Sequence, residues 1–312
     1  MEKSTLLIKP DPECESRWLA AMAPYADSVA VRLWPAVGAP AEVDFALLWA
    51  PPPGLLAPLV NLQAVFSIGA GVDGILRVPD LPRDVPLVRM VDKSLTEGMG
   101  GFVVYQCLRF HRDFSQYEAQ QIARKWKALP QVPPAQRRIG IMGLGELGGY
   151  AARQLCALGF TLRGWSRRPR AVDGVETFAG PGELEKFLRG CDIVVCLLPL
   201  SPQTEKILNA KTLAMLPPGA CVINAARGAH VDDTALLAAL DRGHLKAAAL
   251  DVFNAEPLPQ AHPYWRHPKV TITPHAAAFT LPESAAAQVV ENIRRCRRGE
   301  ALLNLVDREA GY

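Results

Sequence analysis

The sequence lacks a long hydrophobic run, a large excess of either charge, and the pattern of a signal peptide in its first residues. No stretch of its 312 residues approaches the roughly 20 consecutive apolar residues of a membrane helix. Residues 1–10 place acid and base around three apolar residues, unlike a signal peptide. The net charge is only +3 with scattered arginines, so we expect neither nucleic acid nor a membrane as partner. These absences predict a cytoplasmic protein.

The cysteines lack the spacing of a metal site or a disulfide framework. There are seven, an odd number, and no C-x-x-C pair occurs. Cys191 and Cys196 flank a strongly apolar run, but their odd spacing along a strand directs them to opposite faces. We therefore expect reduced thiols and no metal.

What the sequence contains is the alternation of an α/β protein. A composition of 49% hydrophobic and 21% charged residues suits a globular protein of two domains. Short apolar runs alternate with helix-like stretches along the chain, which predicts parallel sheets. We expect a Rossmann-like doubly wound sheet, the nucleotide-binding domain, at residues 104–283. It is inserted in a smaller flavodoxin-like substrate domain at 1–103 and 284–312. One long helix, from about Leu95 to Lys127, should link them.

A glycine cluster marks the start of the larger domain. The apolar run 138–142 stops at Gly143-Leu144-Gly145-Glu146-Leu147-Gly148, where a helical pattern begins. Gly143 allows a sharp turn, Gly145 allows the backbone to approach a pyrophosphate, and Gly148 allows the helix to press on the sheet. Since the N–H groups of the new helix face such an anion, the motif predicts a dinucleotide site.

The turn after the next strand predicts which dinucleotide binds. An NAD site usually carries an acid there, but this chain has Ser166-Arg167-Arg168. A hydroxyl and two guanidinium groups can hydrogen-bond and neutralise a ribose 2′-phosphate, which a carboxylate would repel. We therefore predict NADPH over NADH, the alternative being that these arginines form an ordinary solvated turn.

Three polar residues follow predicted strands where α/β sheets place function. They are Arg227, Glu256 and His275. A lone arginine is usually a solvated charge and a lone histidine is usually structural. Together, however, they can reduce a carbonyl with a nicotinamide, because histidine can supply the proton and a carboxylate favours its imidazolium form. Arginine can bind a carboxylate while polarising the adjacent carbonyl.

Over nearly its whole length the chain resembles the D-isomer-specific 2-hydroxyacid dehydrogenases, particularly the glyoxylate/hydroxypyruvate reductase A type. The landmarks are residues 67–73, 143–148, 196–200, 224–228, 250–258 and 273–275. The resemblance implies that Arg227 binds the substrate carboxylate and carbonyl, His275 donates the proton, and Glu256 is its partner. It also implies a homodimer paired through the nucleotide-binding domains.

The resemblance and the motifs together give a set of expected contacts. The cofactor set is Gly143, Gly145, Glu146, Leu147, Gly148, Ser166, Arg167, Arg168, Leu198, Pro199, Ala225, Ala226 and Asp251. The substrate set is Trp49, Ala70, Gly71 and Arg227. Backbone N–H groups of residues 69–72 would hold the substrate carboxylate. Trp49 could equally be an ordinary core aromatic residue.

One segment departs from the family pattern. The linking helix opens with Thr96-Glu97-Gly98-Met99-Gly100-Gly101, where the family usually has a small residue, an acid and a histidine. Because each glycine costs a helix roughly 1 kcal/mol relative to alanine, we expect the helix to begin later than the periodic pattern alone indicates.

The sequence thus predicts NADPH-dependent reduction of a small 2-keto acid, glyoxylate or hydroxypyruvate, to its 2-hydroxy acid. One alternative is an enzyme for a larger 2-keto acid, such as phenylpyruvate. The other is a dinucleotide-sensing binding protein, since transcriptional corepressors share this architecture and such a sensor would consume almost no nucleotide.

Overall fold

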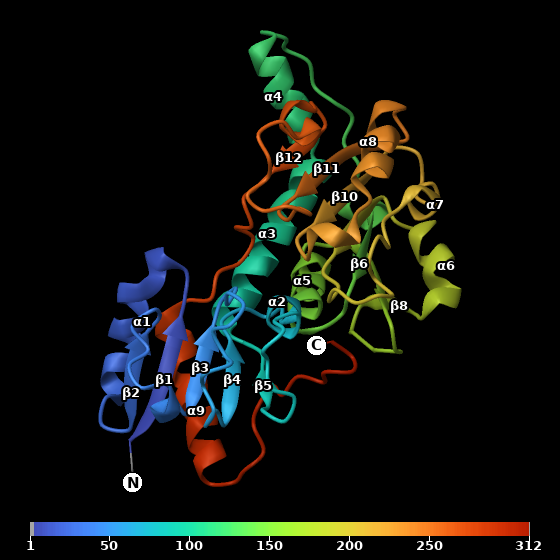
Figure 1. Ribbon diagram of the computed structural model, residues 1–312. Helices are drawn as coiled ribbons and strands as arrows, with labels where there is room; N and C mark the ends of the chain where they lie inside the picture. The colour runs from blue at the N-terminus through green and yellow to red at the C-terminus, as the bar shows by residue number, and fades with distance from the viewer. Residues whose placement is uncertain (1–2, 312) are drawn as a thin grey trace. The chain divides into compact units, whose positions relative to one another are not determined.

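The computed structural model describes residues 3–311, which form two compact α/β units (Figure 1). Unit 1 comprises residues 3–95 and 279–311, and unit 2 comprises residues 96–278. An insertion of one α/β unit into another was expected, and the predicted fold class is confirmed. The divisions fall several residues before the expected boundaries at 103/104 and 283/284. The first lies within an unbroken helix, α3 (Lys93–His111), where sequence gives no signal for a boundary.

Unit 1 is built on a five-stranded parallel sheet in the order β2-β1-β3-β4-β5. This is the flavodoxin-like strand order, whose topological switch point lies between β1 and β3. The strands are β1 (Ser4–Lys9), β2 (Val29–Leu33), β3 (Phe45–Leu48), β4 (Ala64–Ser67) and β5 (Leu87–Val88). The helices of this unit are α1 (Glu15–Met22), α2 (Asp73–Leu76) and α9 (Pro282–Arg297).

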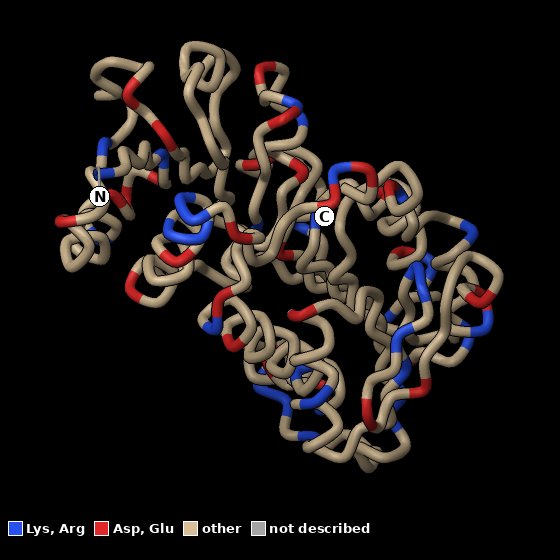
Figure 2. Tube along the Cα trace, turned by 90° about the horizontal axis from the view of Figure 1, so that it is seen from below, with Lys and Arg blue, Asp and Glu red and all other residues tan. Residues whose placement is uncertain are grey.

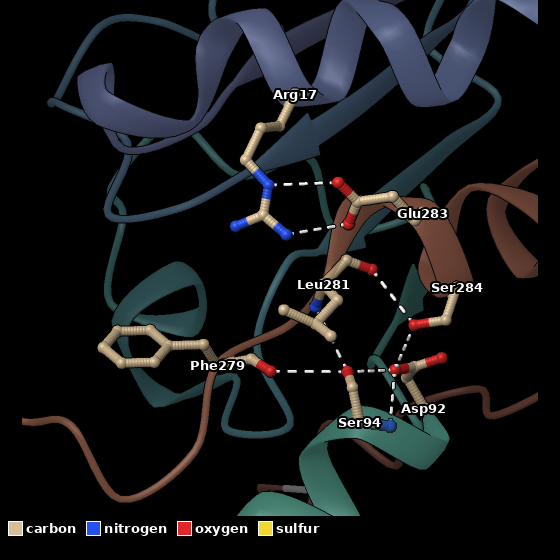
Figure 3. Close-up of polar contacts among 7 residues, drawn as sticks. All are labelled: Arg17, Asp92, Ser94, Phe279, Leu281, Glu283 and Ser284. Atoms are coloured by element: carbon tan, nitrogen blue, oxygen red, sulfur yellow. Dashed lines mark hydrogen bonds and ion pairs between the residues drawn. The ribbon is translucent and has the colours of Figure 1, made fainter.

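The last helix, α9, returns to unit 1 as the sequence predicted. Its first turn is held against α1 by Arg17, whose Nε and Nη2 donate to the two carboxylate oxygens of Glu283 at 3.0 and 2.8 Å (Figure 3). Both side chains are about half exposed, so this pair fixes geometry more than it adds stability. Buried side chains of α9, such as Val289 and Ile293, supply the apolar contact.

A second set of polar contacts ties together the two places where the chain crosses between the units (Figure 3). The buried carboxylate of Asp92 accepts hydrogen bonds from the Ser94 amide and the Ser284 hydroxyl, both at 2.8 Å. The Ser94 hydroxyl accepts the Leu281 amide at 3.1 Å and lies 3.3 Å from the Phe279 carbonyl oxygen. The segment that leaves unit 1 is therefore bonded to the segment that returns.

Unit 2 is built on a seven-stranded parallel sheet in the order β12-β11-β10-β9-β6-β7-β8. This doubly wound order is Rossmann-like, with the switch point between β6 and β9. The strands are β6 (Arg138–Met142), β7 (Thr161–Ser166), β8 (Val175–Ala179), β9 (Ile193–Cys196), β10 (Ala220–Asn224), β11 (Leu245–Leu250) and β12 (Val270–Ile272). Besides α3, the helices are α4 (Phe114–Ile122), α5 (Glu146–Ala157), α6 (Leu184–Leu188), α7 (Ala210–Leu213) and α8 (Asp233–Asp241).

The linking helix differs from the prediction at both ends. α3 begins at Lys93, before the glycines, so the expected later start is wrong. A Cβ on Gly100 would lie 2.5 Å from the Tyr150 ring, which shows that this glycine lets α3 pack closely on α5. Tertiary packing thus outweighs helix propensity. The helix then stops near Asp113, whose φ of 58° is left-handed, and the separate helix α4 follows.

The seven cysteines are free thiols, as predicted, and four of them are buried. Burial raises the pKa of the Cys191 thiol to about 12, which keeps it protonated and unreactive at neutral pH.

Among residues 3–311 no group of three or more histidine, cysteine or acidic side chains gathers to hold a metal ion. No helix in the described range has the length and apolar character to cross a bilayer. Figure 2 shows acidic and basic positions interspersed along the chain.

Candidate functional site

The three motif glycines, which lie after β6 and in the first turn of α5, have the distinct geometries that the motif predicted. Gly143 has a φ of +100°, and a Cβ there would lie 2.6 Å from the Leu197 carbonyl oxygen. Gly148 is packed closely, since a Cβ would lie only 1.8 Å from the Gly143 carbonyl oxygen. Gly145 differs, because nothing lies within 4 Å of its Cβ position. Two glycines therefore shape the turn, and the third leaves open space beside it.

The start of α5 fits the pyrophosphate of a dinucleotide. Gly145 is the N-cap residue and provides no side-chain hydrogen bond to the first turn. The N–H groups of that turn, with the positive end of a 12-residue helix behind them, are therefore directed toward the open space at Gly145. Leu147 follows in the same turn. The residues present thus fit the dinucleotide that the sequence predicted.

The turn after β7 carries the predicted phosphate selector. Ser166 ends the strand, and its hydroxyl donates to the Arg168 carbonyl oxygen at 2.7 Å. Arg167 and Arg168 are exposed. The guanidinium of Arg170 lies 3.9 Å from the carboxylate of Glu146, so the turn is linked to the first residue of α5. The 166–168 segment itself contains no carboxylate.

The other predicted cofactor contacts follow neighbouring strands of the same sheet. Leu198 and Pro199 come after β9, Ala225 and Ala226 come after β10, and Asp251 comes after β11. Since the strands are parallel, these residues share the carboxyl edge with the glycine turn. The structure therefore brings the predicted cofactor set together within unit 2, while the role of each residue remains a prediction.

The backbone of Arg227 is held in place by a buried asparagine. Asn224 is fully buried, and its Nδ2 donates to the Arg227 carbonyl oxygen at 2.8 Å. Its Oδ1 accepts the Ala226 amide at 3.2 Å. The Arg227 guanidinium donates to the Ala226 carbonyl oxygen at 2.7 Å. Next to it, Gly228 would place a Cβ 1.9 Å from the backbone of Phe253, so this loop packs directly on the loop that carries Glu256.

Glu256 and His275 form the predicted pair. His275 Nδ1 lies 2.8 Å from Glu256 Oε2, while Glu256 Oε1 accepts the Phe253 amide at 2.8 Å. Burial alone would raise the pKa of Glu256. The hydrogen bonds from His275 and Phe253, with the nearby charge of Arg227, outweigh burial and leave this pKa below its usual value. A carboxylate therefore faces Nδ1 and fixes the orientation of the imidazole ring.

The loop that carries His275 is strained and is held by Asp251. His275 has a φ of +53°, in the left-handed region, which costs of order 1 kcal/mol. The buried Asp251 carboxylate accepts the Thr273 hydroxyl at 2.6 Å and the amides of Ala276 and Ala277 at 2.8 and 3.0 Å. Its carbonyl oxygen accepts the His275 amide at 2.8 Å. Asp251 was predicted to contact the cofactor, but sequence did not predict that it also shapes the histidine loop.

The predicted substrate residues of unit 1 lie at the carboxyl edge of its sheet. Trp49 follows β3, and Ala70 and Gly71 follow β4. A Cβ on Gly69 would lie 2.8 Å from the Trp49 ring, so this ring packs on the glycine loop. The Lys9 ammonium donates to the Trp49 carbonyl oxygen at 2.8 Å. Trp49 is thus adjacent to the predicted carboxylate loop, and its contact with substrate remains a prediction.

Known proteins match the chain over nearly its full length. Residues 104–277 match the family described as D-isomer specific 2-hydroxyacid dehydrogenase, NAD binding domain. A glyoxylate/hydroxypyruvate reductase A from Serratia proteamaculans is 44% identical over 301 residues, covering 95% of this chain and 96% of the relative. A second protein of that name, from Yersinia enterocolitica, gives the same identity and coverage.

Solved structures agree in fold as well as in sequence. A D-isomer specific 2-hydroxyacid dehydrogenase from Xanthobacter autotrophicus Py2, in complex with NADPH and MES, superposes with a TM-score of 0.96 at 43% identity, covering 100% of both chains. An NADPH-dependent glyoxylate/hydroxypyruvate reductase from Sinorhizobium meliloti, in complex with NADP and sulfate, gives 0.94 at 39% identity, covering 99% of this chain and 100% of the other. The resemblance noted from sequence is confirmed, and the chain belongs to the D-isomer specific 2-hydroxyacid dehydrogenase family.

Proposed function

We propose that the protein is an NADPH-dependent reductase of small 2-keto acids, converting glyoxylate to glycolate and hydroxypyruvate to glycerate. The observation that carries this proposal is the Glu256–His275 pair beside Arg227, at the carboxyl edge of a sheet with an open glycine turn. The names of the relatives support the same reaction.

In the proposed mechanism the cofactor and three side chains of unit 2 act on the substrate. When bound, NADPH supplies the hydride. The Arg227 guanidinium binds the substrate carboxylate and stabilises the negative charge that grows on the carbonyl oxygen. Nε2 of His275 donates the proton to that oxygen, while Glu256 fixes the ring through Nδ1 and stabilises its charged form. Backbone N–H groups of residues 69–72 are proposed as further donors to the carboxylate.

Turnover tests the proposal. The purified protein should oxidise NADPH rapidly with glyoxylate and hydroxypyruvate, and more slowly with pyruvate and phenylpyruvate. Arg227→Ala should lower kcat/KM for glyoxylate roughly 100- to 1000-fold, whereas Arg242→Ala, an exposed arginine of the same unit, should have no effect. Nucleotide binding without turnover of any keto acid would favour a sensor instead. Faster turnover of phenylpyruvate would favour the larger substrate.

Preference for NADPH over NADH is tested at the 166–168 turn. Arg167→Ala combined with Arg168→Ala removes two guanidinium groups from the predicted 2′-phosphate position. We expect KM for NADPH to rise roughly tenfold or more and KM for NADH to change little, since each lost charge-assisted bond costs about 1.5–3 kcal/mol. Equal changes for both nucleotides would contradict the assignment of this turn.

We further propose a cytoplasmic homodimer paired through unit 2. The free thiols support the compartment. The pairing is supported by helix α4, none of whose residues is buried. Ile122 in this helix is 86% exposed and Trp126 just beyond it is 103% exposed, and such exposed apolar side chains are typical of a protein–protein interface. Replacing both with aspartate should convert a dimer to a monomer in light scattering. Val60→Asp, at an exposed apolar residue of unit 1, is the control. A monomeric parent protein would refute the pairing.

A further inference from the structure

His230 is a buried polar residue that the proposed mechanism does not use. It is 0% exposed and ends the short turn Gly228–His230 that follows Arg227. A buried imidazole must satisfy its two nitrogens inside the protein, so its partners show what it holds in place.

Both ring nitrogens contact the backbone of functional loops. Nδ1 accepts the Arg227 amide at 3.2 Å and lies 3.1 Å from the Arg227 carbonyl oxygen. Nε2 lies 3.3 Å from the Pro199 carbonyl oxygen, on the loop after β9. A single ring therefore connects Arg227 to the loop after β9.

We propose that His230 is a positioning residue that fixes the backbone of Arg227 and thereby aims its guanidinium at the substrate carboxylate. The inference rests on the proposed function of Arg227. Asn224 holds the Arg227 carbonyl oxygen, and His230 holds its amide, so the two buried side chains fix the residue on both sides. Accurate placement matters, because an error of about 1 Å in a binding group can cost roughly 100-fold in rate.

A double-mutant cycle tests this role. His230→Ala should lower kcat/KM for glyoxylate about 10- to 100-fold in the parent protein. In an Arg227→Ala background the same change should alter kcat/KM less than about twofold, because a residue that acts through another has no effect once that other side chain is gone. Equal losses in both backgrounds would overturn the proposal.

Two controls separate positioning from simple stability. His244 also places its Nε2 3.0 Å from a carbonyl oxygen, that of Leu213, but it precedes β11 and lies at the opposite edge of the sheet. His244→Ala should lower Tm and leave kcat/KM within about twofold. In His230→Asn the amide oxygen can replace Nδ1, and it should restore most of kcat/KM. If it restores Tm but not kcat/KM, the ring does not act by holding Arg227.

A binding measurement keeps this inference distinct from the reaction itself. Oxalate, a two-carbon dianion that needs no turnover, is titrated into the NADPH complexes of the same proteins and followed by fluorescence. Oxalate affinity should fall with His230→Ala and should be insensitive to it once Arg227 is alanine. If the parent protein binds oxalate in this pattern but reduces no keto acid, the proposed function fails and the positioning role stands. If the parent protein binds no oxalate, the positioning role fails.

Discussion

Two glycine-containing loops follow buried parallel strands, one in each unit, and their glycines are used differently. After β6 in unit 2, Cβ atoms on Gly143 and Gly148 would collide with backbone oxygens. After β4 in unit 1, a Cβ on Gly69 would collide with the side chain of Trp49, while the nearest backbone atom lies at an ordinary contact distance of 3.8 Å. The first loop leads into the 12-residue helix α5, and the second leads into the four-residue helix α2. One loop is shaped by backbone packing, and the other by a side chain.

The difference explains why the first loop was predicted in detail and the second only by resemblance. Backbone collisions occur whatever residues surround them, so the spacing of the glycines alone indicates the turn. A collision with a tryptophan depends on which residue the fold brings beside the glycine. A sequence pattern within residues 67–73 cannot indicate that Trp49 lies beside Gly69. The comparison makes specific predictions about how each loop tolerates a methyl group.

Gly148→Ala should have the largest effect. Its Cβ would lie 1.8 Å from a backbone oxygen that cannot move without disrupting the turn, so we expect a loss of about 3 kcal/mol or more in the free energy of unfolding. Urea denaturation measures it. The adjacent Gly149→Ala is the control, since the nearest atoms lie at 3.6 and 3.8 Å and alanine favours the helix. Similar stability of the two variants would show that backbone packing at Gly148 does not shape this loop.

Gly145→Ala should affect the ligand rather than the fold. Its Cβ would enter open space, and its φ of −69° suits alanine, so the free energy of unfolding should change little. The methyl group would occupy the space predicted for the pyrophosphate, and Kd for NADPH should rise roughly tenfold or more. Gly182→Ala, also in open space in unit 2, should leave Kd unchanged. If Gly145→Ala binds NADPH with unaltered Kd, the pyrophosphate does not bind at Gly145.

Gly69→Ala should have a smaller effect, because the Trp49 ring can shift. We expect a loss of about 1 kcal/mol in stability, a severalfold rise in KM for glyoxylate and no change in Kd for NADPH. Gly74→Ala, with nothing within 4 Å, is the control in the same unit. A loss as large as that of Gly148→Ala would show that this loop is also held by backbone packing.

Glu256→Gln should have the smallest effect on stability and tests a side-chain contact within unit 2. Because the pKa of Glu256 lies below its ordinary value of 4.5, the ionised carboxylate stabilises the fold above that pH. This contribution is lost as the pH falls through the lower folded pKa. The variant should therefore be less stable at neutral pH by under about 1 kcal/mol, and the difference should vanish in acid. Glu205→Gln, an exposed carboxylate, should show no such pattern.

Much of the fold followed from periodicity, and the exceptions have physical causes. The strands β6, β9 and β10 are almost wholly buried, and their apolar runs predicted them. The edge strand β8 buries only one of its five residues, so its sequence contains no apolar run that would predict it. The start of α3 was wrong because the glycines that weaken the isolated helix improve its packing. Local patterns do not contain that tertiary contact.

The residues of the candidate site likewise fall into those that the sequence predicted and those that it did not. Arg227, Glu256 and His275 were predicted because each follows a strand and their chemistry is complementary. The residues that hold them, Asn224 and His230, gave no such signal. A buried histidine is indistinguishable in sequence from a solvated one until its partners are known.

The contacts among Asp92, Ser94 and Ser284 have a consequence for how such a chain can be assembled. They bring the departing and returning ends of an inserted segment, residues 96–278, to adjacent positions on unit 1. Loop-closure entropy grows only with the logarithm of loop length, so these ends tolerate an insertion of almost any size. The whole of unit 2 therefore occupies a single connection of unit 1, in the position that a short loop would otherwise take.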